Sequence, residues 1–359
     1  MGIGGTMANW MPGVLDSSEF KAKWHKFIDL QKNTRRRYIH CLYPGCSKRT
    51  IYSHTVALRS LRQIQSATCK VVESAQLEPH AQTRICGHAI SVVPNEVGVR
   101  RASAYTLFCQ THDQHFVQFD NSRDPPDMRT AFLAAYRSFC LEYFKKETCT
   151  PAYNARDEIF SLPEGVRNDP IAKAERRVWD GGHAVIREVK SRLDNAISRN
   201  DWSVLRHVYI SLEGEPAILA SGAASLELTF DGKLLASPYE DEATMVAISS
   251  RAFEKRTDLL FSILGSCHFG RRYIGSIERL KANDVARTIP FVLLDLTENC
   301  YMNPDWFNAL RQAESFQAVL RMQVYRMSGL FGSPRVTNWR VARRKRLVDL
   351  VTSGSDALR

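Results

Sequence analysis

The sequence of 359 residues lacks several features that would place it in a common class. No apolar run approaches the roughly 18 residues that a membrane-spanning helix needs. The sequence also lacks the charged segment followed by an apolar run that would predict a secretory signal. No glycine-rich loop of the Walker A or Rossmann type occurs, and neither does an internal repeat or a low-complexity tract. We therefore expect a cytoplasmic protein without a membrane segment that does not itself use nucleotides to drive work.

A disulfide framework is also not predicted. The chain contains nine cysteines, an odd number, and they are scattered over a long sequence. Small secreted proteins held by disulfides have short chains with dense, even sets of cysteines. Metal ligation or simple burial is therefore the better explanation for these thiols.

Acidic residues are absent from positions 31–72, although the same segment is rich in lysine, arginine and tyrosine. The whole chain carries a formal net charge of +11. A surface of one sign attracts the phosphate backbone of DNA or RNA without reading its sequence. The alternative is an ordinary solvated face. We expect nucleic acid to be the partner, contacted by Arg35, Arg36, Arg37, Lys48, Arg49, Arg59 and Arg62.

Four potential metal ligands occur as two closely spaced pairs. Cys41 and Cys46 lie in CLYPGC, where the Pro-Gly pair favours a tight turn that brings the thiols together. Cys109 and His112 lie in CQTH, where a strand ending at the cysteine and a helix starting near the histidine would place both side chains together. Three sulfurs and one imidazole can complete a tetrahedral zinc site. The alternative is that the cysteines are core residues and His112 caps a helix.

The order of these parts resembles a known family. A cysteine pair, a histidine on a strand, a second strand and a Cys-x-x-ligand that opens a helix are similar to the treble-clef, ββα-metal arrangement of HNH endonucleases. The resemblance covers about residues 38–118. It implies that a structural zinc stabilises a small module. The pattern is also similar to that of uncharacterised bacterial proteins, some of them in phage-defence loci.

The same resemblance implies a catalytic site. It makes His54 the general base and Asp113 a ligand of Mg²⁺ or another divalent cation, with His115 as a further contributor. Such a pair suits phosphodiester hydrolysis, which needs a base and a cation that neutralises phosphate charge. The sequence departs from the family at Ser53, where Asp is usual, and in the long connection 55–108.

Each of these two residues also has a plain structural interpretation. His54 could be a buried core histidine or an additional zinc ligand. Asp113 could be a first-turn carboxylate that the helix dipole favours. Without catalysis, the protein would be a zinc-scaffolded binding or partner-docking protein. An effector that is silent until a partner activates it is a third interpretation.

The hydrophobic patterns predict an α+β protein. We expect a zinc-binding module with flanking helices over residues 1–150, a helical connector over 151–204, and a second α+β domain over 205–359. The last segment could dock a protein partner or a second copy of the chain. The long helical region near 169–199 is expected to be interrupted at DGGH, and IPFVLLDL (289–296) is expected to form a buried strand.

Overall fold

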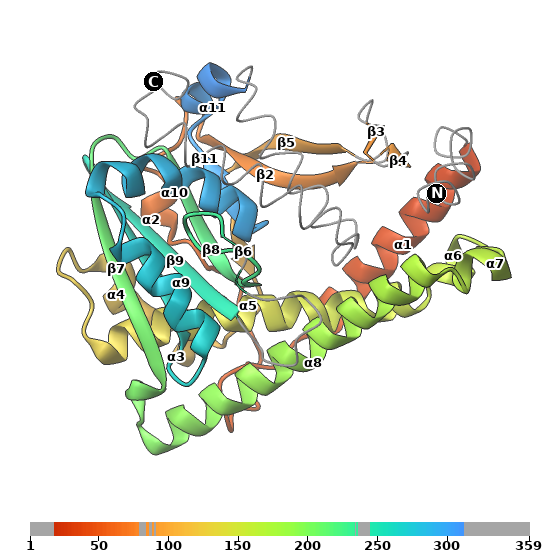
Figure 1. Ribbon diagram of the computed structural model, residues 1–359, viewed down its shortest axis with the longest axis horizontal. Coiled ribbons are helices and arrows are strands. Elements are labelled where there is room, and N and C mark those ends of the chain that lie inside the picture. Colours follow the sequence, from red (N-terminus) through yellow and green to blue (C-terminus); the bar gives the residue numbers. More distant parts are fainter. Residues whose placement is uncertain are drawn as a thin grey trace.

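The computed structural model describes residues 18–78, 84–85, 88–89, 91–233, 235 and 245–311. Helices and strands are mixed, which confirms the α+β class (Figure 1). The first half contains α1 (Ser18–Arg37), β1 (Ser53–His54), α2 (Leu58–Leu61), β2 (Lys70–Glu78), β3 (Arg84–Ile85), β4 (His88–Ala89), β5 (Ser91–Gly98), β6 (Ala104–Tyr105), α3 (Gln110–Asp113), the 3₁₀ turn η1 (Gln114–Phe116), α4 (Val117–Asn121) and α5 (Met128–Asn154). The second half contains α6 (Arg156–Ile159), α7 (Glu164–Arg167), α8 (Pro170–Arg199), η2 (Trp202–Val204), β7 (Leu205–Glu213), β8 (Ile218–Ser225), β9 (Met245–Phe253), β10 (Arg256–Leu264), α9 (His268–Glu278), α10 (Ala282–Leu296), β11 (Cys300–Met302) and α11 (Pro304–Leu310).

One antiparallel sheet organises the chain. Its seven strands lie in the order β5-β2-β11-β8-β9-β10-β7. The short strand β11 pairs with β8 on one side and with β2 on the other. The connection 55–108 therefore supplies two strands to a sheet whose other strands come from residues 205–311. This sheet crosses the boundaries between the segments expected from the sequence.

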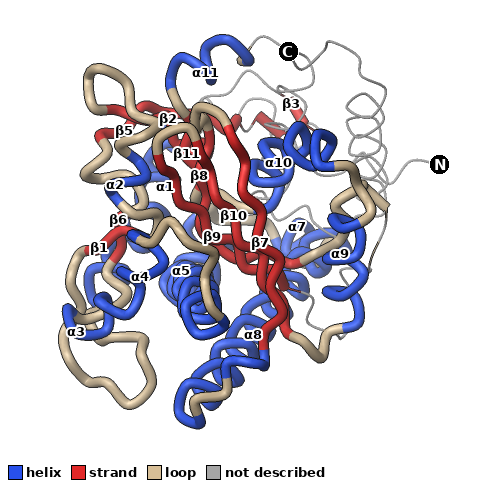
Figure 2. Tube along the Cα trace, turned by 90° about the vertical axis from the view of Figure 1, so that its left-hand side faces the viewer, coloured by secondary structure: helices blue, strands red, loops and turns tan. Residues whose placement is uncertain are grey.

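Helices cover both faces of the sheet (Figure 2). Successive residues of β9 alternate between the two cores, as the period of two in a strand requires. Val246 and Ile248 face the core that α9 and α10 cover. Met245 and Ala247 face a second core, which contains α5, α8 and the segments around Cys41 and Cys109. The candidate metal ligands thus sit at the edge of a core rather than on a separate module.

Helix α5 is the central buried helix of this second core. Asp127 caps its first turn by accepting a hydrogen bond from the amide of Thr130 at 2.7 Å. Every residue from Thr130 to Leu141 is buried. Further along, α5 packs against α1 and α8 in an arm that extends away from the sheet, with α7 at its far end (Figure 1). The far ends of these helices therefore lie away from the sheet and from the cysteines.

Two expectations about elements were wrong. Residues 289–296 belong to helix α10, although they include Pro290. An apolar run of this length fits a buried helix as well as a buried strand, and periodicity does not separate them. Helix α8 continues through Gly181 and Gly182, because packing of its later turns on α5 outweighs the low helix propensity of glycine.

Candidate metal centre

The cysteine pair and the Cys–His pair meet in space, as the sequence predicted. One ligand atom from each of Cys41, Cys46, Cys109 and His112 lies within 4.8 Å of all the others. Nδ1 of His112 is 3.5 Å from the Cys41 sulfur and 3.4 Å from the Cys109 sulfur, and the sulfurs of Cys46 and Cys109 are 3.9 Å apart. A tetrahedral zinc ion with bonds of about 2.3 Å to sulfur and about 2.0 Å to nitrogen separates its ligands by about 3.5 to 3.8 Å. The donor set and the spacing therefore both fit zinc.

Local backbone contacts hold the first pair in a tight turn. The amide of Cys46 donates to the carbonyl of Tyr43 at 3.1 Å, and Gly45 has the positive φ of 71° that the turn needs. The amide of Cys41 donates to the carbonyl of Lys48 at 3.0 Å, which closes the loop. The spacing CxxxxC thus encodes a small loop with both thiols on its inner side.

The second pair opens a helix. Cys109 precedes the first residue of α3, and its carbonyl accepts hydrogen bonds from the amides of His112 and Asp113. The Tyr43 ring stacks on the His112 imidazole, with ring centroids 4.0 Å apart and 11° between the planes. This stack fixes the imidazole with Nδ1 toward the sulfurs. Burial raises the pKa of the Cys41 thiol to about 11, and burial together with the charge of His115 and Lys48 lowers the pKa of His112.

Hydrogen bonds from α5 and α8 also hold the ligand loop in place. The carbonyl of Leu42 accepts hydrogen bonds from the Tyr136 hydroxyl at 2.8 Å and from Nζ of Lys190 at 2.9 Å. Both donors also contact the carboxylate of Asp194. Tyr136 comes from α5 and Lys190 from α8, so two helices far along the chain position the residue beside Cys41.

Strands β1 and β6 form a small antiparallel sheet of their own, although the connection that carries β2 and β5 separates them in sequence. Ser53 pairs with Tyr105, and His54 pairs with Ala104. A buried polar network ties this β1–β6 sheet to β11. The side-chain amide of Asn299 donates to Thr55, Ser103 and the carbonyl of Ser221, while its oxygen accepts from Tyr301 and Tyr105.

The β1–β6 sheet and α3 bring His54 and Asp113 within electrostatic reach of each other. Nε2 of His54 is 3.3 Å from the carbonyl of Val99. Burial lowers the pKa of His54, although this hydrogen bond and the charges of Asp113 and Asp120 act in the opposite direction. Burial raises the pKa of Asp113, while a hydrogen bond with Ser53 and the nearby Arg137 act against the rise. The lowered pKa of His54 favours the neutral form of its imidazole.

His115 points to a different neighbourhood. Its ring lies edge-on to Tyr43, with centroids 5.1 Å apart, and 5.4 Å from the His112 ring. Burial and the charge of Arg129 lower its pKa. The structure therefore places His115 beside the cysteine–histidine cluster, whereas Asp113 on the same short segment contacts Ser53 of the β1–β6 sheet.

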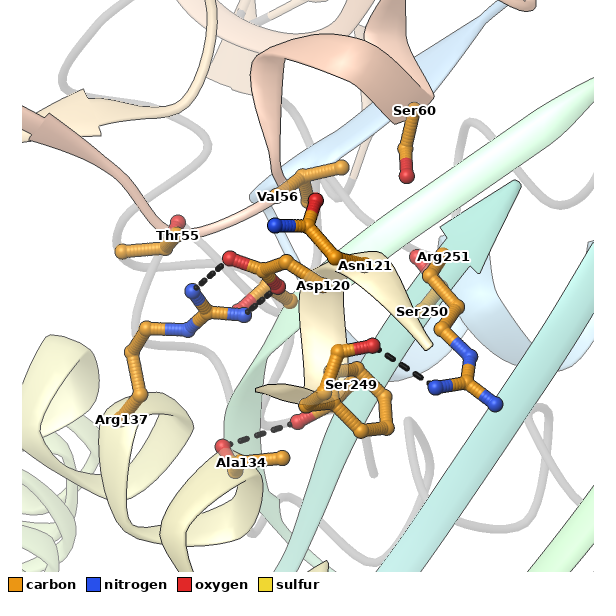
Figure 3. Close-up of polar contacts among 12 residues, drawn as sticks. Thr55, Val56, Ser60, Asp120, Asn121, Ala134, Arg137, Ser249, Ser250 and Arg251 are labelled. Carbon is orange, nitrogen blue, oxygen red and sulfur yellow. Dashed lines mark hydrogen bonds and ion pairs between the residues drawn. The ribbon is translucent and has the colours of Figure 1, made fainter. Parts of the chain in front are cut away.

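An ion pair next to Asp113 was missed by sequence reasoning. Arg137 of α5 holds Asp120 through two contacts, of 2.8 and 2.6 Å (Figure 3). The Arg137 side chain is 3% exposed, so the pair lies inside the protein. Asp120 lies on α4, beyond the 3₁₀ turn η1 that follows Asp113, and its charge acts on Asp113. No local sequence signal marks its arginine partner, because the pairing is set by tertiary packing.

The expected basic contacts are mostly exposed but spread over three places. Arg36 and Arg37 end α1, Lys48 and Arg49 lie in the ligand loop, and Arg59 and Arg62 lie at α2. Arg35 differs from the others because it is half-buried and donates to the Cys149 sulfur at 3.7 Å. Six of the seven expected residues are therefore accessible to a ligand in solution.

Among the described residues, no helix has the length and apolar character to cross a bilayer. Comparison of the chain with protein families, with curated proteins and with solved structures finds no match.

Proposed function

We propose that this protein is a zinc-stabilised nucleic-acid-binding protein with an HNH-like endonuclease site. The observation that carries the proposal is the convergence of four potential ligands, Cys41, Cys46, Cys109 and His112, beside the β1–β6 sheet that bears His54. A loop with two thiols, a pair of antiparallel strands and a helix that begins at the second ligand pair are similar to the parts of a treble-clef module, although the connection 55–108 separates the two strands in sequence. The exposed arginines and lysines around it supply charge for a phosphate backbone.

In this proposal His54 accepts a proton from the attacking water. A neutral imidazole that donates through Nε2 to the Val99 carbonyl keeps its lone pair on Nδ1, the form that a general base requires. Asp113 offers a half-buried carboxylate to Mg²⁺ or another hard cation, which would neutralise charge on the phosphate. The hydrogen bond with Ser53 orients that carboxylate. Antiviral defence is the biological setting that the resemblance suggests.

The test compares cutting by the zinc-loaded protein and by His54→Ala. Labelled double-stranded DNA, single-stranded DNA and RNA are incubated with Mg²⁺ or Mn²⁺. Loss of the base is expected to slow cutting by about 100-fold or more, because general-base catalysis contributes that much. Zinc content and thermal stability should be unchanged. The matched control is His268→Ala, an exposed histidine at the start of α9. If His54→Ala cuts as fast as the wild type, the catalytic assignment is wrong.

A second candidate is a non-enzymatic scaffold that binds nucleic acid or docks a partner protein. It is favoured by the distribution of potential metal ligands, because the cysteine–histidine cluster is the one group of three or more such side chains within the described residues. The Val99 contact of His54 also fits a structural histidine. Under this candidate, the wild type binds nucleic acid and His54→Ala leaves that binding unchanged, but neither protein cuts.

A further inference from the structure

Four arginines surround the ring of Phe253 at the end of the β9–β10 hairpin. The centres of the guanidinium groups lie between 4.8 and 5.7 Å from the ring centroid. Phe253 itself is 3% exposed, so the ring lies buried beneath the exposed members of the cluster. Guanidinium groups bind aromatic faces because the ring quadrupole attracts a cation. The arginines of this cluster are Arg59, Arg123, Arg251 and Arg256.

These arginines do not share one role. Arg251 is fully buried and is neutralised by the buried Asp258 at 2.9 Å, and it also donates to the carbonyls of Phe119 and Asp124. It is a structural residue. Arg256 contacts the same carboxylate at 3.2 Å, and 29% of its side chain is exposed. One carboxylate thus serves two guanidinium groups, which leaves positive charge in excess.

Arg59 and Arg123 are exposed and are not paired with a carboxylate in any contact that the structure gives for them. Arg59 donates to the side-chain oxygen of Asn121 at 3.1 Å, which orients it over the ring without cancelling its charge. Arg62, one turn after Arg59, and Lys255, in the hairpin turn, add two exposed cations. The exposed acids next to these residues are Asp124, Glu254 and Glu213, which lies opposite Arg256 in the β7–β10 ladder. They are fewer than the cations Arg59, Arg62, Arg123, Lys255 and Arg256, so positive charge remains in excess.

A chain of contacts links the cluster to the candidate catalytic residues. Arg59 donates to Asn121. The neighbouring Asp120 is held by Arg137 (Figure 3), and Arg137 acts against the rise in the pKa of Asp113. A strand of nucleic acid that reaches His54 and Asp113 could therefore extend to this fixed set of guanidinium groups. Guanidinium is the group best suited to phosphate oxygens, because its planar fork can donate two hydrogen bonds at once.

We propose that the Phe253 arginine cluster is a phosphate-binding subsite for the backbone of a nucleic-acid strand. Arg59 and Arg123 contact phosphate, Arg256 contributes charge, and Arg251 with Phe253 holds the others in place. This inference rests on the proposed nucleic-acid binding, and it adds Arg123 and Arg256 to the residues expected from the sequence. Stacked guanidinium groups lose less freedom on binding than extended lysines, so the subsite is preorganised.

The test is fluorescence anisotropy with labelled single-stranded DNA, double-stranded DNA and RNA, without Mg²⁺ so that no cutting interferes. The variants are Arg123→Glu and the double variant Arg59→Ala/Arg123→Ala. The control is Arg167→Glu in α7, an exposed arginine at the far end of the helical arm. We expect affinity to fall by about 10-fold or more at about 0.1 M salt. In the double variant, the slope of log affinity against log salt should shrink by about 1.5 to 2, the value for two lost phosphate contacts.

Melting temperatures separate binding from folding, since Arg123 is exposed and its loss should leave stability unchanged. If the wild type binds and both variants bind with unchanged affinity and salt slope, the subsite is wrong while the proposed function stands. If Arg49→Glu weakens binding and Arg123→Glu does not, the same conclusion follows. If the wild type binds none of the three probes, the proposed function and the subsite both fail.

Discussion

Nζ of Lys190 lies 2.9 Å from the carbonyl oxygen of Leu42, the residue that follows Cys41. The same ammonium group contacts both carboxylate oxygens of Asp194 at 2.6 Å, and its side chain is 9% exposed. A lysine from α8 thus fixes the backbone of the ligand loop near the start of the chain. The candidate metal centre and the helical layer are therefore one structural unit.

Replacement of this lysine should weaken both folding and metal binding. Lys190→Met keeps the length of the side chain but removes the contacts with Leu42 and Asp194. Because hydrogen bonds of a charged group to buried partners contribute about 1.5 to 3 kcal/mol, we expect the free energy of unfolding in urea to fall by about 2 kcal/mol. A chelator should also remove zinc more readily. Lys173→Met, an exposed position on the same helix, is the control. An unchanged chelator titration would contradict the bracing role.

Among the polar residues that link the β1–β6 sheet to the seven-stranded sheet, Asn299 should be the one whose replacement costs the most stability. Its side chain is 1% exposed and donates to Thr55 at 3.1 Å and to the carbonyl of Ser221 at 2.8 Å. Asn299→Leu leaves several buried polar groups without partners, each worth about 1 to 3 kcal/mol. We expect a loss of about 3 kcal/mol in urea unfolding and faster hydrogen exchange at the Thr55 amide. Asn168→Leu, on the surface, should change stability by less than about 0.5 kcal/mol. Equal effects of the two changes would refute the network.

His207 should make the fold sensitive to acid. Burial lowers its pKa to about 4, and Nδ1 lies 2.8 Å from the Ser262 hydroxyl. The unfolded chain takes up a proton below about pH 6.5, whereas the folded chain takes it up near pH 4, so stability falls as the pH drops between these values. The loss from this group is about 3 kcal/mol. His207→Gln should flatten that part of the urea-derived stability profile, and His268→Gln should not. A slope that His207→Gln leaves intact would argue against the buried histidine as its cause.

The sequence signals that succeeded are local ones. The four ligands were found from CxxxxC and CxxH, because a tight turn and a helix start bring residues at those spacings together by short-range geometry. The structure brings the two pairs into one cluster. The start of α11 has the same local character, because Asn303 caps the helix and Pro304 suits its first turn.

The features that sequence reasoning missed depend on contacts between distant segments. Lys190 was one cation among many on a helix, and nothing near it in sequence marks its contact with Leu42. Arg137 and Asp120 lie on different helices, and their pairing follows from how α5 packs. The arginines around Phe253 come from three separate parts of the chain. The connection 55–108 looked like an insertion, but its strands complete the sheet.

The most direct test is the metal content of the purified protein and of Cys109→Ser, measured by atomic emission. Cys69→Ser, an exposed cysteine outside the cluster, is the control. We predict about one zinc per chain in the wild type and in the control, and loss of that zinc in Cys109→Ser. A wild type that holds no zinc when grown with zinc, together with a Cys109→Ser variant that folds normally, would show that the cysteine–histidine cluster is not a zinc site.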